Sequence, residues 1–313
     1  MNGEPEPVSL STEQSWPTPM VVSVQSRVAM GHVGNSAAVL PLQLAGLEVV
    51  DVPTALLSNH PFYPGHTGAL LGADVVGQLL TGISDRGVGR AARAVISGFL
   101  GAAAVAPVLA DFLGSARSAN PGLRYICDPV LGDAGSGFYV EPALVRQYRE
   151  RLLPLADLCT PNTFELEQLT EGGIRTVADV GQRAEALLTE RSGALVLTGA
   201  RLFDTPPDFL DSIVVSVSGG VRETWRVRGP RRRRHFDGTG DVFTALLTAA
   251  WLAGPATTDT VPAAALRAVA GTAEVVEQTV ADATKELQLI AVGARMIRPS
   301  SSVMARVSLD RLS

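Results

Sequence analysis

The segment Gly238-Thr239-Gly240-Asp241 places a permissive turn and a carboxylate directly before the apolar run Val242 to Gly254. The first turn of a helix presents unpaired backbone N–H groups and a partial positive charge, and glycines let an oxyanion approach them. A carboxylate at that point can take a proton from an attacking hydroxyl. The segment therefore indicates phosphoryl transfer, although ordinary helix capping after a flexible turn explains the same four residues.

Two further carboxylates, Asp128 and Asp133, follow the predicted strand Arg124-Cys127. In a doubly wound sheet the carboxyl ends of the strands face the ligand crevice. Asp128 and Asp133 could there hold Mg²⁺ against phosphate oxygens, directly or through water. A turn in which each Asp accepts hydrogen bonds from its own backbone is an equally good interpretation.

The segment Thr160 to Glu165 follows the next predicted strand. Asn162 as N-cap and Glu165 three residues later have the spacing of a capping box, which is a structural role. This capping role does not exclude a second role for Glu165 in the coordination shell of Mg²⁺. Near the N-terminus, Ser23-Val24-Gln25-Ser26 ends a strand and Gly31-His32-Val33-Gly34-Asn35 leads into a helix, where a hydroxyl and exposed amides can meet a small polar substrate.

Other reactive residue types carry weaker signals. The run Arg231-Arg234 could stabilise ATP phosphates, but a solvated loop explains most of these arginines. Cys127 and Cys159 have neither metal-ligand spacing nor the density of a disulfide scaffold, which fits a reducing cytoplasm. The four histidines also lack the spacing of a metal site.

The scaffold for these residues is predicted from alternating apolar runs and helical patterns. Runs suited to buried parallel strands are Met20-Val24, Glu48-Val52, Ala94-Ser97, Arg124-Cys127, Asp157-Thr160 and Ala194-Thr198. Helices are expected at Asn35-Ala45, Gly68-Leu80, Pro142-Leu152, Thr163-Leu169, Thr176-Thr189 and Val242-Leu252. This order predicts an α/β fold with a mostly parallel, doubly wound sheet and helices on both faces.

The last third of the chain has a different pattern of apolar and polar residues. Ser212-Ser218 and Val221-Val227 surround the Gly219-Gly220 turn and predict a small antiparallel hairpin. From Val261 onward apolar and polar residues alternate at helical spacing. We expect one domain over residues 20–313, preceded by a disordered extension over residues 1–19 that is rich in proline and glutamate.

Composition narrows the function. The chain has 313 residues, 46% of them hydrophobic and 18% charged, which is enough for a substantial core. Its net charge of −5 provides no general field for nucleic acid or anionic lipid. The most apolar uncharged run, Ala94 to Ala110, falls short of the roughly 20 residues that a membrane span needs. We expect a cytoplasmic protein that acts on small molecules.

Read in order, the segments at 23–26, 31–35, 58–60 (Ser-Asn-His), 127–133, 160–165 and 238–241 resemble those of the pyridoxal kinases, in the ribokinase-like superfamily. The resemblance runs from about Val21 to Val292. It implies ATP-dependent phosphorylation of the 5′-hydroxyl of pyridoxal in vitamin B6 salvage, with pyridoxine and pyridoxamine as further substrates. It also implies Mg²⁺, a monovalent cation such as K⁺, and a homodimer.

The resemblance assigns roles by motif position. Asp241 is implied as the general base, and the amides of Gly238, Thr239 and Gly240 as the anion hole. The implied substrate contacts are Ser26, His60, Pro61 and Asp241; those for ATP are Asp128, Thr160, Asn162, Glu165, Thr198, Gly199, Gly238 and Thr239. Asp128, Asp133 and Glu165 would organise MgATP, with Asp133 and Glu165 at the metal.

One residue departs from the family pattern. Pro61 stands where pyridoxal kinases usually have Thr, so a hydroxyl and a backbone donor are missing there. Alternatives are therefore another ribokinase-like kinase, such as hydroxymethylpyrimidine kinase, or a catalytically silent protein that binds vitamin B6 or ATP. Acceptor assays separate these three.

Overall fold

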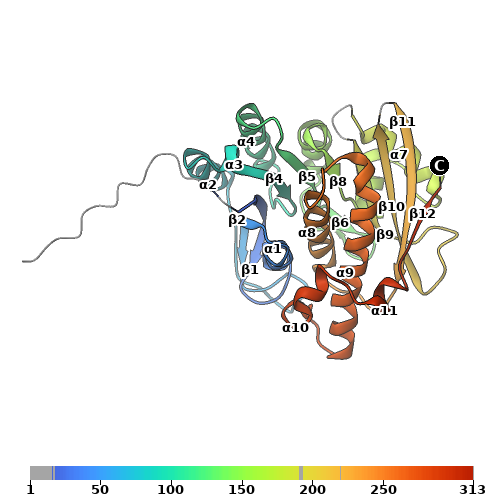
Figure 1. Cartoon of the computed structure of the whole chain (residues 1–313). Helices are drawn as coiled ribbons and strands as arrows, with labels where there is room; N and C mark the ends of the chain where they lie inside the picture. Colours follow the sequence, from blue (N-terminus) through green and yellow to red (C-terminus); the bar gives the residue numbers. More distant parts are fainter. Residues whose placement is uncertain (1–15, 17, 190–192, 219, 313) are drawn as a thin grey trace, which may run out of the picture.

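A computed structural model describes residues 16, 18–189, 193–218 and 220–312 (Figure 1). These residues form a ten-stranded sheet and a separate two-stranded hairpin. In spatial order the sheet contains β12 (Ser308–Arg311), β11 (Val221–Pro230), β10 (Phe209–Ser218), β9 (Ala194–Ala200), β8 (Leu158–Cys159), β5 (Arg124–Cys127), β4 (Ala92–Ser97), β1 (Met20–Val28), β2 (Glu48–Leu57) and β3 (Gly68–Leu70). The hairpin pairs β6 (Gly132–Asp133) with β7 (Gly137–Phe138).

The six strands from β2 to β9 in this order are parallel, as their continuous apolar runs predict. The chain leaves β1 toward β2 at one side and later returns to β4 at the other side. This reversal is the topological switch point of the sheet. Ligands of open α/β sheets bind beyond the carboxyl ends of the strands at such a point.

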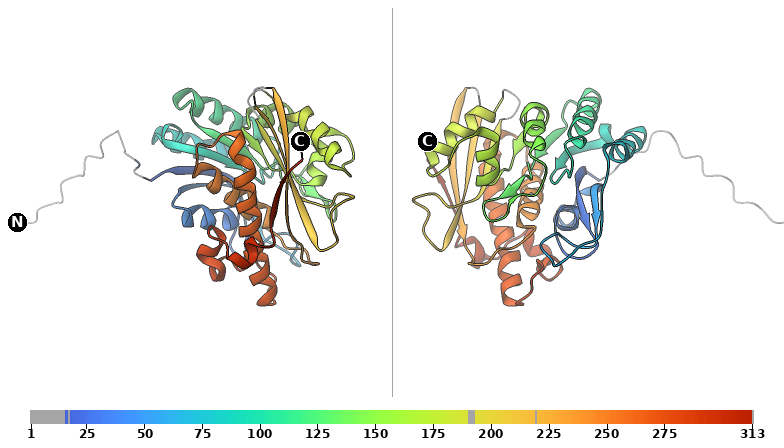
Figure 2. Two further views of the ribbon diagram at one scale, coloured as in Figure 1. Left: turned by 45° about the vertical axis from the view of Figure 1, so that its right-hand side comes forward. Right: turned by 180° about the vertical axis from the view of Figure 1, so that it is seen from behind.

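Helices cover both faces of the sheet (Figures 1 and 2). One face carries α1 (Asn35–Leu44), α8 (Thr239–Leu252), α9 (Val261–Ala281) and α10 (Leu289–Val292). The other carries α2 (Ala73–Asp85), α4 (Val105–Ala119), α5 (Ala143–Gln147), α6 (Thr163–Thr170) and α7 (Val177–Leu187). Shorter helical turns are α3 (Val88–Ala91), Tyr148–Leu152, Leu153–Leu155, Thr258–Thr260, Gly293–Met296 and α11 (Ser301–Met304).

Apolar residues of β1 pack against the helices on both faces of the sheet. Val21 of β1 packs in the cluster beneath α1, α8 and α9, whereas Val22 and Val24 pack in the cluster beneath α2 and α4. Successive side chains of a strand point to opposite faces, so a continuous apolar run fills two cores. Helix α8 packs against α1 and α9 and is buried along most of its length, so its N-terminus is held on a rigid element.

The predicted hairpin is confirmed and is longer than expected. β10 pairs antiparallel with β9 on one side and with β11 on the other. Gly220 follows β10 with a φ of 78°, and Gly219 lies outside the described residues. The sequence reading did not identify β12, which pairs with β11 over only four residues and lacks a strong apolar pattern.

Two helix predictions need correction. The helix expected from Gly68 begins only at Ala73, because Gly68–Leu70 forms β3 against β2. Gly68 has a φ of 125°, and a Cβ there would lie 2.1 Å from the carbonyl oxygen of Leu56, so this position suits an edge strand and not a helix. Helix α4 was missed because Pro107 interrupts its pattern, but a proline in the first helical turn is tolerated.

The expected N-terminal extension falls mostly on residues 1–15 and 17, which lie outside the described residues. Trp16, within the same range, is partly buried against the apolar cluster beneath α2 and α4. Among the residues that the structure describes, no helix is both long enough and apolar enough to cross a membrane.

Candidate active site

The Gly238 turn is fixed by a close approach to the loop after β1. Gly238 is the N-cap of α8, with a φ of 82° and ψ of −1°. A Cβ at this position would lie 1.9 Å from the carbonyl oxygen of His32. Glycine is therefore required both for the left-handed backbone and for the contact.

The start of α8 is open to a ligand. Within the described part of the chain, no side chain caps this helix. A Cβ at Gly240 would meet nothing within 4 Å, and Gly240 is exposed. The first N–H groups of a helix lack acceptors within the helix, so this end can bind an anionic group without displacing a side chain.

Asp241 lies in the first turn of α8, beside the same loop. Burial raises the pKa of its carboxyl to about 6, while hydrogen bonds from the backbone of Gly34 and from its own amide oppose the rise. Gly34 in turn packs against Ser26, since a Cβ on Gly34 would lie 2.3 Å from the Ser26 carbonyl oxygen. Asp241, predicted from the sequence as the base, and Ser26, predicted as a substrate contact, thus share Gly34 as a neighbour.

Asp128, at the end of β5, is buried on the other side of Asp241. Burial and, next, the charge of Asp241 raise the pKa of Asp128 to about 8, and hydrogen bonds from Thr244 and Thr160 partly oppose this. The Thr244 hydroxyl donates to Oδ2 of Asp128 at 3.1 Å. Thr160 Oγ1 lies 3.0 Å from Thr244 Oγ1, so one buried network joins β5, α8 and the residue after β8.

The different surroundings of these two carboxyl groups separate their protonation. The pKa of Asp128, about 8, lies above that of Asp241, about 6, so Asp241 loses its proton first as the pH rises. A pair of acids whose pKa values are pushed apart in this way can divide the roles of proton holder and proton acceptor. Asp241 is therefore the member of the pair that can act as a base.

Asn162 and Glu165 form the capping box that their spacing predicts, at the start of α6. Oε2 of Glu165 accepts the Asn162 amide at 2.8 Å, and Oε1 accepts the Leu131 amide at 3.1 Å. Burial and then the charge of Asp128 raise the pKa of Glu165 well above its ordinary value. Glu165 thus adds a third acid near Asp128 and Asp241, with both oxygens already accepting backbone hydrogen bonds.

Thr198 and Gly199 lie at the end of β9, next to Asn162. Thr198 bridges Asn162 in parallel register, and its amide donates to the Pro161 carbonyl at 2.9 Å. Gly199 is exposed, with a φ of 58° and no atom within 4 Å of a Cβ built there. The end of β9 at Gly199 is consequently open, whereas Asn162 is surrounded by its capping partners.

Asp133 lies on the small β6–β7 hairpin. Its Oδ1 accepts the amides of Gly135 and Ser136 at 2.6 and 2.7 Å, and its Oδ2 accepts the Tyr139 hydroxyl. These hydrogen bonds outweigh the opposing effect of burial and lower the pKa of Asp133. The carboxylate is thus charged and held within its own turn.

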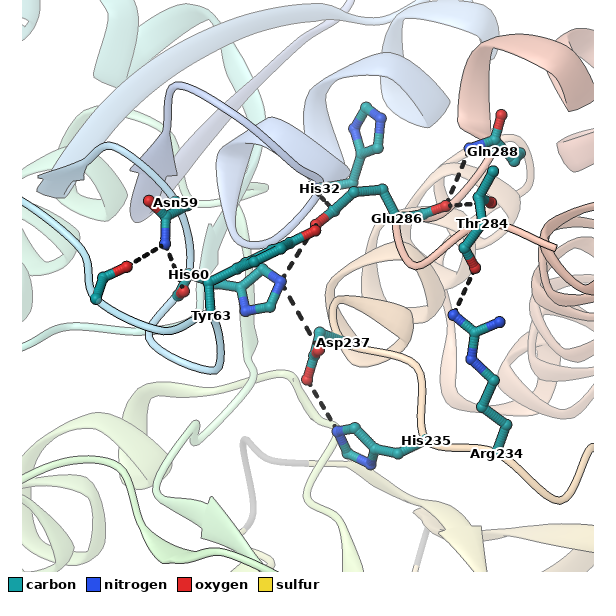
Figure 3. A network of polar contacts seen from close by, with 11 residues as sticks. His32, Asn59, His60, Tyr63, Arg234, His235, Asp237, Thr284, Glu286 and Gln288 are labelled. Atoms are coloured by element: carbon teal, nitrogen blue, oxygen red, sulfur yellow. Dashed lines mark hydrogen bonds and ion pairs between the residues drawn. The ribbon is translucent and has the colours of Figure 1, made fainter. Parts of the chain in front are cut away.

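His60 lies in the loop between β2 and β3, close to Glu286 and to Asp237, which precedes α8 (Figure 3). It is 6% exposed, and its Nε2 lies 3.3 Å from Oε1 of Glu286 and 3.8 Å from Oδ2 of Asp237. Its Nδ1 is buried without a hydrogen-bond partner among the described residues. Pro61, directly after it, is exposed.

The arginine run surrounds this end of the site on the outside. Each of its four members contacts another part of the protein. Arg231 donates to the Pro207 carbonyl and Arg234 to the Thr284 carbonyl. Arg232 donates to Glu277 and Arg233 to Asp208. Three of the four are exposed, which fits a solvated loop.

Cys127 is completely buried, and burial raises its pKa to about 12, so it is not a reactive thiolate.

Comparison with known proteins identifies the family. A family model described as phosphomethylpyrimidine kinase matches residues 75–284. Pyridoxal kinase PdxY of Rubrobacter xylanophilus is 37% identical over 279 residues, covering 89% of this chain and 94% of that protein. The chain belongs to the pyridoxal kinase family. Pyridoxal kinase PdxY of Granulibacter bethesdensis is a further relative, 40% identical over 230 residues, covering 72% of this chain and 79% of that protein.

Solved pyridoxal kinases share the whole architecture. The Leishmania donovani enzyme in complex with ADP and pyridoxine superimposes with a TM-score of 0.85 at 28% identity, covering 94% of this chain and 99% of that one. The complex of the same enzyme with ADP and pyridoxamine gives a TM-score of 0.85 at 27% identity, with the same coverage. The ribokinase-like fold predicted from the sequence is confirmed.

The structure places four residues beside the predicted site residues that the sequence analysis did not single out. Thr244 could have been found, because it lies three residues after Asp241 on one helix face. Asp237 directly precedes the glycine turn but has no pattern of its own. Tyr63 and Glu286 come from remote loops, and their meeting could not be anticipated from spacing (Figure 3).

Proposed function

We propose that this chain catalyses transfer of the γ-phosphoryl group of ATP to the 5′-hydroxyl of pyridoxal, producing pyridoxal 5′-phosphate and ADP. The observation that carries the proposal is the ionisable pair at the start of α8. Asp241 lies in the first turn of a helix whose N-terminus no described side chain caps, and burial raises its pKa to about 6, below the value of about 8 to which burial and the charge of Asp241 raise the pKa of Asp128. The relatives' names, pyridoxal kinase, supply the acceptor.

The chemical step needs little from the protein except position and charge. Asp241 accepts the proton of the 5′-hydroxyl while the hydroxyl oxygen bonds to the γ-phosphorus. At the same time the bond between the γ-phosphorus and the bridging oxygen of ADP breaks. The amides of Gly238, Thr239 and Gly240 stabilise the negative charge of the transferred group. ADP leaves with the bridging oxygen.

Ser26, His60, Pro61 and Asp241 are proposed to bind the vitamin. Ser26 is 7% exposed and adjoins Gly34, which donates its amide to Asp241, so its hydroxyl is near the base. The buried, unpartnered Nδ1 of His60 offers a further polar contact. Pyridoxine and pyridoxamine are proposed as further substrates, because the Leishmania donovani pyridoxal kinase has been solved in complex with each of them and ADP.

ATP is proposed to bind along the ends of β5, β8 and β9, next to Asp128, Thr160, Asn162, Glu165, Thr198 and Gly199, with its phosphates at Gly238 and Thr239. The exposed Gly199 and the open start of α8 leave room at the two ends of this path. Thr160 and Thr198 are also the residues proposed to line a site for a monovalent cation such as K⁺. Stimulation by K⁺ over Na⁺ in the kinase assay tests that assignment.

The acidic residues suit Mg²⁺ bound mainly by phosphate and water. Burial and then the charge of Asp128 raise the pKa of Glu165, so a nearby divalent cation would favour the ionised form of Glu165. The Glu165 and Asp133 oxygens already accept hydrogen bonds, which favours contact through water, and Mg²⁺ commonly keeps several waters. Asp133 and Glu165 are thus proposed as metal-shell residues. Bound Mg²⁺ would neutralise charge on the transferring phosphates.

We further propose that residues 20–313 act as one kinase domain, that the enzyme is a cytoplasmic homodimer, and that residues 1–19 are dispensable for catalysis. Limited proteolysis and activity of a chain starting at residue 20 test the domain assignment. Sedimentation equilibrium tests the dimer.

The decisive experiment is ADP release from Mg²⁺-ATP by the purified protein with pyridoxal, with no acceptor, and with hydroxymethylpyrimidine in parallel. Pyridoxal-dependent release, with pyridoxal 5′-phosphate found by its absorbance, is the expected result. Release with hydroxymethylpyrimidine alone would favour the second candidate, which the description of the matching family model supports. Binding of pyridoxal or ATP without release would identify a silent binding protein.

A further inference from the structure

Glu286 lies in the loop between α9 and α10 and joins three segments that are remote in sequence (Figure 3). Its Oε2 accepts the backbone amide of His32 at 3.0 Å. Its Oε1 accepts the Tyr63 hydroxyl at 2.7 Å and lies 3.3 Å from Nε2 of His60. One carboxylate therefore contacts the loop after β1 and the loop between β2 and β3.

His32 contacts both Glu286 and the turn at Gly238, which is proposed to bind phosphate. The amide of His32 donates to Glu286, and the carbonyl oxygen of the same residue is the atom that excludes a Cβ from Gly238. Gly31 is also closely packed, since a Cβ on it would lie 2.6 Å from Oε2 of Glu286. The backbone at 31–32 is thus clamped between the Glu286 carboxylate and the start of α8.

The same loop continues to the base. Gly34, two residues after His32, gives its amide to the Asp241 carboxylate and packs against Ser26. A shift of residues 31–34 would consequently move the support of Gly238 and of Asp241 together. Displacement of a reacting group by about 1 Å can cost on the order of a hundredfold in rate.

The second arm of Glu286 holds the loop that carries His60. The hydrogen bond to Glu286 raises the pKa of Tyr63, so its phenol stays protonated and a donor. The His60 and Tyr63 rings lie 4.7 Å apart between centroids, and Lys285 Nζ lies 5.3 Å from the centroid of Tyr63. Phe62 then reaches Tyr139 of the β6–β7 hairpin, with ring centroids 5.4 Å apart.

We propose that Glu286 is a positioning residue for phosphoryl transfer, which aligns the 31–34 loop with the Gly238 turn and Asp241 and fixes the His60 loop over the acceptor. The inference rests on the proposed function and extends it to a residue outside the recognised motifs. Glu286 need not touch substrate; it acts through His32 and His60.

The test compares Glu286→Gln with Glu274→Gln. Glu274 of α9 is a matched control because its carboxylate also holds a loop: its Oε1 accepts the Ser300 amide at 2.7 Å and the Ser300 hydroxyl, and its Oε2 lies 3.5 Å from Arg295. Neither Ser300 nor Arg295 belongs to the segments 31–34 or 237–241. Tyr63→Phe is a milder variant that removes only one donor to Glu286. Each variant is assayed for kcat, for KM of pyridoxal and ATP, and for melting temperature.

In Glu286→Gln we expect kcat with pyridoxal to fall about 10- to 100-fold and the KM for ATP to change less than about threefold. Tyr63→Phe should mainly raise the KM for pyridoxal. Hydrogen exchange should quicken in peptides covering 31–35 and 237–241 in Glu286→Gln, but not in Glu274→Gln. If both glutamine variants lose stability equally and keep wild-type kcat per folded molecule, Glu286 is only structural and the proposal fails.

Failure of the proposed function gives a different pattern. If the wild-type protein transfers no phosphate to any acceptor, the kinase assignment falls, yet hydrogen exchange without substrate still reports whether Glu286 holds 31–35 and 237–241. Unchanged exchange in both segments of Glu286→Gln would overturn the positioning role whatever the enzyme's acceptor is.

Discussion

The Thr244 hydroxyl donates a hydrogen bond of 3.1 Å to the buried carboxyl group of Asp128, and the two residues are 116 positions apart in the sequence. Thr244 belongs to the helix that carries Asp241, whereas Asp128 follows a central strand. The bond therefore ties the helix of the proposed base to the sheet. It also moderates the pKa of Asp128, which burial raises.

Replacing Thr244 by Val should destabilise the protein by about 1–3 kcal/mol, because it leaves a buried acceptor without its donor. It should also lower kcat/KM by about tenfold through a shift of α8. Urea denaturation and steady-state kinetics measure the two effects. Thr248→Val is the control, since that hydroxyl donates only to the Thr244 carbonyl within the helix. Equal kinetic effects in both variants would show that the Asp128 bond has no special part in alignment.

Asp241→Asn should lower turnover with pyridoxal by about 10²- to 10⁴-fold, as expected for a lost general base. Binding of ATP should be largely retained, because the helix start and the strand ends are unchanged. ADP release and nucleotide titration by calorimetry measure these quantities. Wild-type turnover in a correctly folded variant would remove Asp241 from the role of base.

The pH profile should report the ionisation of Asp241. Its pKa is raised to about 6, and a base must be deprotonated to act. Below about pH 6, kcat/KM should therefore fall close to tenfold per pH unit. Rates in a constant-ionic-strength buffer series from pH 5 to pH 8 test this, and a flat acid limb would mean that another group accepts the proton.

Asp128 should make stability fall as the pH rises. Its pKa is about 8 in the fold, against 3.8 as the ordinary value, so between these limits the folded protein binds the proton more tightly than the unfolded chain. Its stabilising contribution is complete below about pH 4 and declines toward pH 8, by up to about 1.4 kcal/mol per pH unit. Asp128→Asn should flatten this dependence in Mg²⁺-free denaturation experiments. An unchanged slope would place the titrating group elsewhere.

The two glycines of the turn should respond differently to alanine. Gly238→Ala should cost at least about 1–2 kcal/mol from its left-handed backbone alone, and the contact with His32 adds to this. Gly240→Ala should fold normally, because its surroundings are open, but it should reduce kcat by intruding on the phosphate site. Thermal melting and kinetics distinguish them; equal melting temperatures for both variants would contradict the close approach at Gly238.

Much of the sheet could be predicted from the sequence because its central strands are continuous apolar runs between turn residues. β1, β4, β5 and β9 were all located in this way. The prediction was wrong where local pattern and tertiary context disagree. Gly68–Leu70 pairs with β2 although it precedes a helical pattern, and Pro107 disguised the start of α4.

The start of α8 at the glycine turn was also predictable, because glycines and an Asp before an apolar run are typical of a helix N-terminus. Asn162 and Glu165 were readable as a capping box for the same reason. Glu286 was not, since neither its neighbours nor its spacing distinguishes it from a solvated glutamate. Its significance depends on three loops that meet only in the folded chain.

The bond from His32 to Glu286 spans 254 positions, which has a consequence for how the molecule is made. During synthesis the strands around β1 can pair before residue 286 has been added, whereas this contact cannot form until then. A contact of such long sequence separation also carries a high loop-closure cost. The loop after β1 is thus made long before the residue that fixes its final position.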